Sequence, residues 1–98
     1  MTVHAAVMSF DLHVPESRSL KAKRAAIRPI VDGLRHRYRV SVAEVGHHDQ
    51  WQRAEIGVAV VAESDGRVRT VLEGVERFVA SAPSVELLGT ETSWLEEP

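Results

Sequence analysis

The sequence predicts a single α+β domain with the element order β-α-β-β-α-β. Two stretches carry apolar residues at helical spacing, and four shorter stretches carry them in strand-like patterns. Proline residues and short polar segments separate these stretches. Ninety-eight residues leave no room for a second domain. We therefore expect one domain over residues 1–95 and a frayed tail over residues 96–98.

The first predicted strand covers residues 3–14. Apolar side chains occupy both alternating sets of positions, which is typical of a strand covered on both faces. One set is Val3, Ala5 and Val7, and the other is Ala6, Met8, Phe10 and Leu12. Pro15 cannot continue the hydrogen-bonded ladder and begins a loop.

The first predicted helix begins at Ser19, a good N-cap because its hydroxyl accepts hydrogen bonds from unpaired backbone N–H groups. Its apolar face is formed by residues three, four or seven positions apart. These residues are Leu20, Ile27, Val31, Leu34 and Tyr38. Pro29 lies inside the segment, and we expect it to kink or loosen the helix there.

The rest of the chain predicts two strands, a helix and a last strand. Residues 39–45 and 54–63 have strand patterns, and the polar residues 46–53 between them form a hairpin. A second helix begins at Ser64 or Asp65 and ends before Pro83. A weaker last strand covers residues 85–95.

This element order is the split-βαβ or ferredoxin-like arrangement. Its usual geometry is a four-stranded antiparallel sheet in the order 4-1-3-2, with both helices on one face. In that fold the loop before the first helix and the hairpin between the second and third strands lie at one edge of the sheet. We therefore expect residues 17–21 and 47–51 to be neighbours in space.

The charge distribution indicates an anionic partner. Eight of the twelve Lys and Arg residues lie between Arg18 and Arg39, with Asp32 as the single acid there, and the rest of the chain is net acidic. The free N–H groups at the start of the helix also favour anions. We expect phosphate or RNA contacts from Arg18, Ser19, Lys21, Lys23, Arg24, Arg28 and Arg35. The alternative is that the cations only solvate an exposed helix face.

The hairpin provides a second set of candidate contacts: His47, His48, Asp49, Trp51 and Arg53. Trp51 either stacks on a base or folds down to seal the core. Asp49 either caps the turn or pairs with Arg53. His47 and His48 are adjacent in an extended segment and should point to opposite faces, which argues against a shared metal ion. We expect no metal site, no cofactor and no catalytic constellation.

The sheet face without helices predicts a second kind of surface. The first and third strands are apolar on both sides, so the uncovered face would present a contiguous apolar patch to water. We expect a homodimer that covers this face. The alternative is that small residues such as Gly57 and Ala59 make the face less apolar than the pattern indicates.

Composition also bears on where the protein resides. The chain has no cysteine, so nothing argues for an oxidising compartment. Its longest apolar stretches are far too short for a membrane span, and its first residues lack the pattern of a signal peptide. We expect a cytoplasmic protein that does not bind membranes.

Four stretches resemble the YlxP-like proteins of bacteria: residues 17–24, 40–45, 49–54 and 57–61. The Ser-Leu-Lys and Trp-Gln-Arg-Ala sequences are the most specific of these, and the resemblance covers nearly the whole chain. It implies a ferredoxin-like fold. The family has no established biochemical activity and no agreed catalytic residues. Its genes often lie among translation and ribosome-maturation genes, which implies an RNA- or ribosome-associated role.

Three functional hypotheses follow. The first is a noncatalytic RNA- or ribosome-binding module that uses the basic helix and has no DNA sequence specificity. The second is a regulatory or scaffold homodimer that acts through the open sheet face. The third is an enzyme or binder for a phosphorylated small molecule, with His47, His48 or Asp49 in its site.

Overall fold

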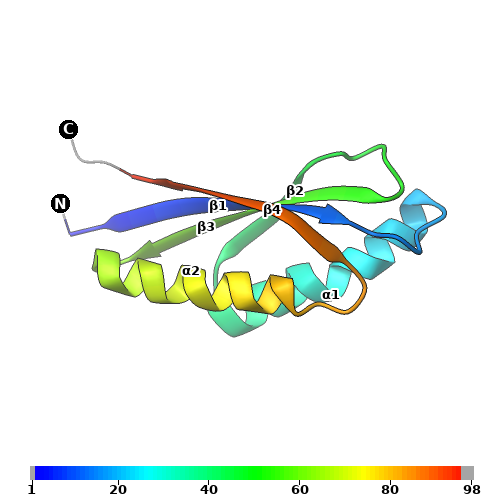
Figure 1. The fold of residues 1–98 in the computed structure, drawn as a ribbon. Coiled ribbons are helices and arrows are strands. Elements are labelled where there is room, and N and C mark those ends of the chain that lie inside the picture. Colours follow the sequence, from blue (N-terminus) through cyan, green and yellow to red (C-terminus); the bar gives the residue numbers. More distant parts are fainter. Residues whose placement is uncertain (1, 96–98) are drawn as a thin grey trace.

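The computed structural model describes residues 2–95 and contains six elements in the predicted order (Figure 1). The predicted tail, residues 96–98, lies outside the described residues. The elements are β1 (His4–His13), α1 (Leu20–Tyr38), β2 (Ser41–Gly46), β3 (Arg53–Ala62), α2 (Asp65–Ala80) and β4 (Glu86–Trp94). Within residues 2–95, neither helix combines the length and apolar character that crossing a bilayer requires.

The four strands form one antiparallel sheet in the order β2-β3-β1-β4, which confirms the predicted topology. Both helices cover the same face of this sheet, and the opposite face carries no helix (Figure 1). The long central strands β1 and β3 pair over ten residues each, from His4↔Ala62 to His13↔Arg53. The fold is therefore the ferredoxin-like arrangement expected from the sequence.

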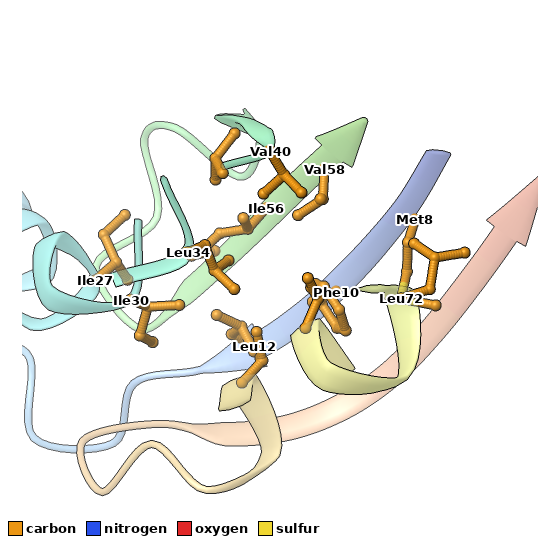
Figure 2. Close-up of a cluster of buried hydrophobic side chains, with 14 of the residues drawn as sticks. Met8, Phe10, Leu12, Ile27, Ile30, Leu34, Val40, Ile56, Val58 and Leu72 are labelled. Atoms are coloured by element: carbon orange, nitrogen blue, oxygen red, sulfur yellow. The ribbon is translucent and has the colours of Figure 1, made fainter. Parts of the chain in front are cut away.

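The hydrophobic core lies between the sheet and the two helices (Figure 2). Alternate residues of the central strands point into it, because successive side chains of a strand face opposite sides. The buried strand residues are Ala6, Met8, Phe10 and Leu12 on β1 and Ala54, Ile56, Val58 and Val60 on β3. The helices contribute Ile27, Ile30 and Leu34 from α1 and Val68, Leu72, Val75 and Val79 from α2. Ile30 belongs to this core although the predicted apolar face omitted it.

Both helices begin as the sequence predicts. The Ser19 hydroxyl accepts a hydrogen bond from the Ala22 amide at 3.0 Å, which satisfies an N–H group that the helix leaves free. Ser64 caps α2 in the same way. Pro29 does not end the helix, since α1 runs as one α-helix from Leu20 to Tyr38. Pro29 lies on the exposed side of the helix, away from the core.

Glycine residues let aromatic rings lie against the helix backbones. A Cβ atom on Gly33 would overlap the ring of Phe78, and one on Gly74 would lie 2.7 Å from a ring carbon of Tyr38. Each ring comes from the opposite helix, so these glycines allow a close helix–helix contact. The rings of Tyr38 and Phe78 are themselves 6.2 Å apart.

Candidate nucleic-acid interface

The loop before α1 and the β2–β3 connection meet at one rim of the molecule, as predicted (Figure 1). The side-chain amide of Gln52 donates to the carbonyl oxygens of Pro15 and Ser17 at 3.3 and 3.2 Å. In return, the Val14 amide donates to the Gln52 carbonyl at 2.9 Å. Segments more than thirty residues apart are therefore held together by direct hydrogen bonds.

Lys23 connects the two segments from inside, and its predicted role as a phosphate contact is wrong. Its side chain is fully buried, at 0% exposure. The Nζ atom donates to the carbonyl oxygens of His47, His48 and Arg53 at 2.8, 3.2 and 3.2 Å. It also lies 3.0 Å from a carboxylate oxygen of Glu44, which is itself mostly buried. The ammonium group thus fixes the loop after β2 and does not reach solvent.

The other predicted cations of α1 form an exposed stripe. Lys21, Arg24, Arg28 and Arg35 are all solvent-exposed. At 3.6 residues per turn they fall within a sector of about 60° on the helix circumference. This cationic stripe lies beside edge strand β2, because Arg35 donates to the Val42 carbonyl oxygen at 2.8 Å. Arg18 is exposed in the loop before the helix and extends the positive charge to the rim.

The local electrostatics of the stripe are unfavourable in the isolated domain. The first turn of α1 has no acidic residue, although carboxylates are the groups that stabilise the positive end of a helix dipole. Across residues 2–95, no carboxylate lies within ion-pair distance of Arg18, Lys21, Arg24 or Arg28. An anion bound beside the N-terminal half of α1 would relieve this repulsion. Ser19, in contrast, is occupied as the helix cap.

The β2–β3 loop presents Trp51 to solvent. Its side chain is 56% exposed, so it does not seal the core. His47 has a positive φ of 58° and its carbonyl accepts the Gln50 amide, which makes a tight turn just before Trp51. The two histidines have different partners: His47 contacts the Gln50 amide side chain, and His48 contacts the Glu44 carbonyl oxygen. Asp49 is exposed.

Arg53 pairs with Asp11 on β1, so the predicted alternative of an Asp49 pair is wrong. Its Nη2 atom lies 2.8 and 2.7 Å from the two carboxylate oxygens of Asp11. This hydrogen bond holds the pKa of Asp11 below its ordinary value of 3.8, and His47, 3.5 Å away, lowers it further. Asp11 was not singled out in the sequence. Across residues 2–95, no group of three His, Asp, Glu or Cys side chains is placed to hold a metal ion.

Comparisons with known proteins agree with the sequence resemblance. Residues 5–92 match the family described as "Protein of unknown function (DUF503)". The chain belongs to this family. It is 35% identical over 79 residues to the "Uncharacterized protein YlxP" of Bacillus subtilis (strain 168), an alignment that covers 81% of this chain and 86% of that protein.

Solved structures share the fold at low sequence identity. The de novo designed protein Foldit4 aligns with a TM-score of 0.54 and 14% identity, covering 96% of this chain and 99% of that one. The YXEP protein of Bacillus subtilis, described as a dinuclear metal binding peptidase from M20 family, aligns with a TM-score of 0.58 and 15% identity. That alignment covers 95% of this chain but 26% of the peptidase. Both likenesses concern the fold alone.

Proposed function

We propose that this protein is a noncatalytic RNA-binding module that associates with the ribosome or its precursors. The observation that carries the proposal is the cationic stripe of α1, four exposed Lys and Arg side chains on one flank. Lys21 and Arg35 are fourteen residues apart, which corresponds to about 21 Å of helix. At roughly 3.4 Å of axis per phosphate, this length matches about six phosphates of one nucleic-acid strand.

Trp51 supports RNA over other polyanions. It is exposed on the loop that Lys23 ties to α1, and we infer that a strand following the stripe towards the rim continues to its indole ring. Stacking of a base on an aromatic side chain contributes about 1–3 kcal/mol and requires an unpaired base. Single-stranded loops of RNA offer such bases. The stripe would therefore bind the phosphate backbone of the RNA, and Trp51 would stack on unpaired bases. This mode of binding involves no recognition of a DNA sequence.

The family supports a ribosomal source for this RNA. The gene neighbourhood implied by the YlxP-like resemblance lies among translation and ribosome-maturation genes. The chain's formal charge of −2 also argues against a general nucleic-acid binder, since such domains are usually basic overall. A partner with structured RNA and a defined docking site fits a domain whose positive charge is confined to one flank.

The decisive experiment reverses charges on the stripe. In the double variant Lys21→Glu, Arg24→Glu, affinity for fluorescent ribosomal RNA fragments should fall by more than tenfold in titrations. The matched control is Arg67→Glu, Arg77→Glu, which makes the same charge change at exposed positions of α2. The control should bind nearly as the unmodified protein does, because its substitutions leave the stripe intact.

Salt dependence provides the second readout. Four phosphate contacts predict a slope of log K against log salt of about −3 for single-stranded RNA, and neutralising one cation of the stripe should make the slope shallower by about 0.7. Cosedimentation with ribosomal particles from lysate, with and without nuclease, then identifies the target. Equal loss of affinity in both double variants, or no measurable RNA binding by the unmodified protein, would refute the proposed function.

A further inference from the structure

The helix-free face of the sheet is divided into an apolar half and a charged half. The apolar half-face is formed by Val7, Ala43, Val45, Gly57, Ala59 and Val61, which alternate with the core residues of β1, β2 and β3. Three of its valines are more than half exposed: Val7 at 53%, Val45 at 52% and Val61 at 72%. Exposed valines that share one face of a sheet contribute to the kind of patch that marks an interface.

The charged half lies further along the same strands and already has internal partners. Asp11 is paired with Arg53, and His13 lies 3.5 Å from Glu86. Glu55 follows on β3, directly opposite Asp11 in the strand register. Covering these groups with an apolar surface would remove several charges from water, which costs free energy unless each is matched. A partner should therefore cover the apolar half-face and leave the charged half wet.

The apolar half-face has both a depression and a projection. The depression has a volume of about 500 Å³ and is lined by Val7, Val45 and Gly57, with polar residues such as Ser9, Glu91 and Ser93 on its β1 and β4 side. A side-chain atom of Val45 lies only 3.0 Å from the position that a Cβ atom on Gly57 would occupy. Val61 lies four residues after Gly57 on β3 and projects from the same face. It is the most exposed large apolar side chain of that face. The two features are about 13 Å apart at strand rise.

We propose that the apolar half-face packs against the same half-face of a second copy of this chain. A two-fold axis that crosses the strands between Val61 and Gly57 places the valine of each copy over the glycine of the other. Such an isologous contact uses one surface twice and closes on itself. In this arrangement the charged half of each copy extends beyond the Val61 end of the partner's apolar half-face and stays outside the apolar contact. This proposal is independent of the proposed RNA-binding function, which uses the flank of α1.

The available area fits a reversible dimer. Residues 3–9 of the first strand region span about 23 Å at 3.3 Å per residue, and the three strands that carry the apolar half-face span about 14 Å at 4.8 Å spacing. The footprint is then roughly 330 Å² per copy, or about 660 Å² for both copies. Specific interfaces begin at about 1,000 Å², so this contact area is that of a weak interface. The dimer should therefore dissociate on dilution.

Analytical ultracentrifugation over a dilution series tests the proposal. The unmodified protein should pass from dimer to monomer, and Val61→Glu should remain monomeric throughout. The matched control is Leu88→Glu, since Leu88 on β4 is 52% exposed but lies level with the charged half. The control should associate as the unmodified protein does. A monomeric unmodified protein at every concentration, or equal association of Val61→Glu, overturns the proposal.

Cysteine crosslinking provides a second test that does not depend on affinity. The chain contains no cysteine, so a single introduced thiol can react only with its counterpart in another copy. Ala59→Cys lies midway between Val61 and Gly57 on β3, where the two-fold axis passes, and a bifunctional thiol reagent with a span of about 10 Å should link it to its counterpart across the packed sheets. Leu88→Cys should react at least tenfold more slowly. Equal rates for the two variants contradict the proposed axis.

High salt distinguishes this contact from RNA binding. An apolar interface should persist at salt concentrations that release RNA, because screening weakens charge pairs and leaves apolar burial intact. The stripe variant Lys21→Glu, Arg24→Glu should dimerise normally, and Val61→Glu should still bind RNA. If lipid vesicles or RNA, and not a second copy, protect Ala59→Cys from thiol reagents, the occupant assigned to this face is wrong.

Discussion

Replacing Lys23 by methionine should destabilise the protein more than any other change to a charged residue of α1. Methionine keeps much of the buried stem but removes the ammonium group and its three hydrogen bonds to loop carbonyls. The His47 carbonyl keeps one partner, the Gln50 amide. The Glu44 carboxylate, only 18% exposed, would lose its counterion and remain largely buried.

The expected loss is about 3–5 kcal/mol, the usual cost of removing one partner from a buried charge pair. A domain of this size has a free energy of unfolding of about 5–15 kcal/mol in total. The melting temperature should therefore fall by at least about 12 °C, at roughly 4 °C per kcal/mol. The matched control is Lys21→Met, an exposed position two residues away, which should change stability by less than about 0.5 kcal/mol.

Urea unfolding followed by circular dichroism measures both variants. Hydrogen exchange should also show loss of protection in residues 47–53, because Lys23 holds the carbonyls of His47 and His48 in the loop and of Arg53 at the start of β3. Adding Glu44→Gln to Lys23→Met should recover part of the stability, since the uncompensated carboxylate is then gone. If Lys23→Met and Lys21→Met have the same free energy of unfolding, the buried ammonium does not stabilise the rim as described.

Three further predictions concern packing, pH and the loop. Gly74→Ala should destabilise the fold by about 1–2 kcal/mol in urea titrations, because the new methyl group meets the ring of Tyr38. The control Gly66→Ala adds a methyl group in open space and should be neutral or stabilising by up to about 1 kcal/mol. Equal effects of the two substitutions would refute the packing argument. Asp11→Asn should cost up to about 1 kcal/mol at neutral pH. Arg53 lowers the pKa of Asp11 on folding, so the stabilisation by the Asp11 carboxylate is fully present at pH values above 3.8 and is lost as the pH falls further. If the difference in free energy of unfolding between the unmodified protein and Asp11→Asn does not change with pH, the assignment is wrong. Trp51→Ala should leave the melting temperature nearly unchanged and weaken RNA binding by about 1–3 kcal/mol; unaltered affinity would remove this residue from the interface.

The fold could be predicted almost completely because its signals are local. Each strand and helix has its own apolar periodicity, and the predicted boundaries lie within two residues of the observed ones for most elements. The strand order then follows from the β-α-β-β-α-β succession and the handedness of crossovers. The same topology predicts that Ser17 and the β2–β3 loop are neighbours, which the hydrogen bond from Gln52 to the Ser17 carbonyl oxygen confirms.

The burial of Lys23 could not be predicted from residue type, because lysine is almost never fully buried without a partner. Its partners are mostly backbone carbonyls, which leave no mark on the sequence. One signal was present. Lys23 precedes Ile27 by four positions and Ile30 by seven, so it lies on the core face of α1 and not on the cationic stripe.

The ion pair of Asp11 with Arg53 could not be predicted, for a different reason. Asp11 interrupts an apolar strand, and its partner Arg53 is forty-two positions away in the sequence. Their contact depends on the register of β1 against β3, which pairs His13 with Arg53 and leaves Asp11 on the diagonal. A shift by one residue would turn the carboxylate into the core. Register is a property of the assembled sheet, so no local pattern of either strand reveals this pair.

The net charges of α1 and of the rest of the chain are opposite in sign, and only Glu44 of the acidic remainder pairs with a cation of α1 among the ion pairs of residues 2–95. Residues 18–39 carry a formal charge of +7 and the remainder −9, which gives −2 overall. The molecule measures 46 × 25 × 18 Å, whereas the screening length at physiological salt is about 8 Å. A phosphate beside the cationic stripe is then screened from acids across the domain. At about 0.01 M salt the screening length reaches about 30 Å, so the acidic residues outside α1 repel a phosphate bound at the cationic stripe. As the salt concentration is lowered, the increase in RNA affinity should therefore level off. If log affinity instead rises linearly with decreasing log salt down to about 0.01 M, the acidic residues do not weaken RNA binding.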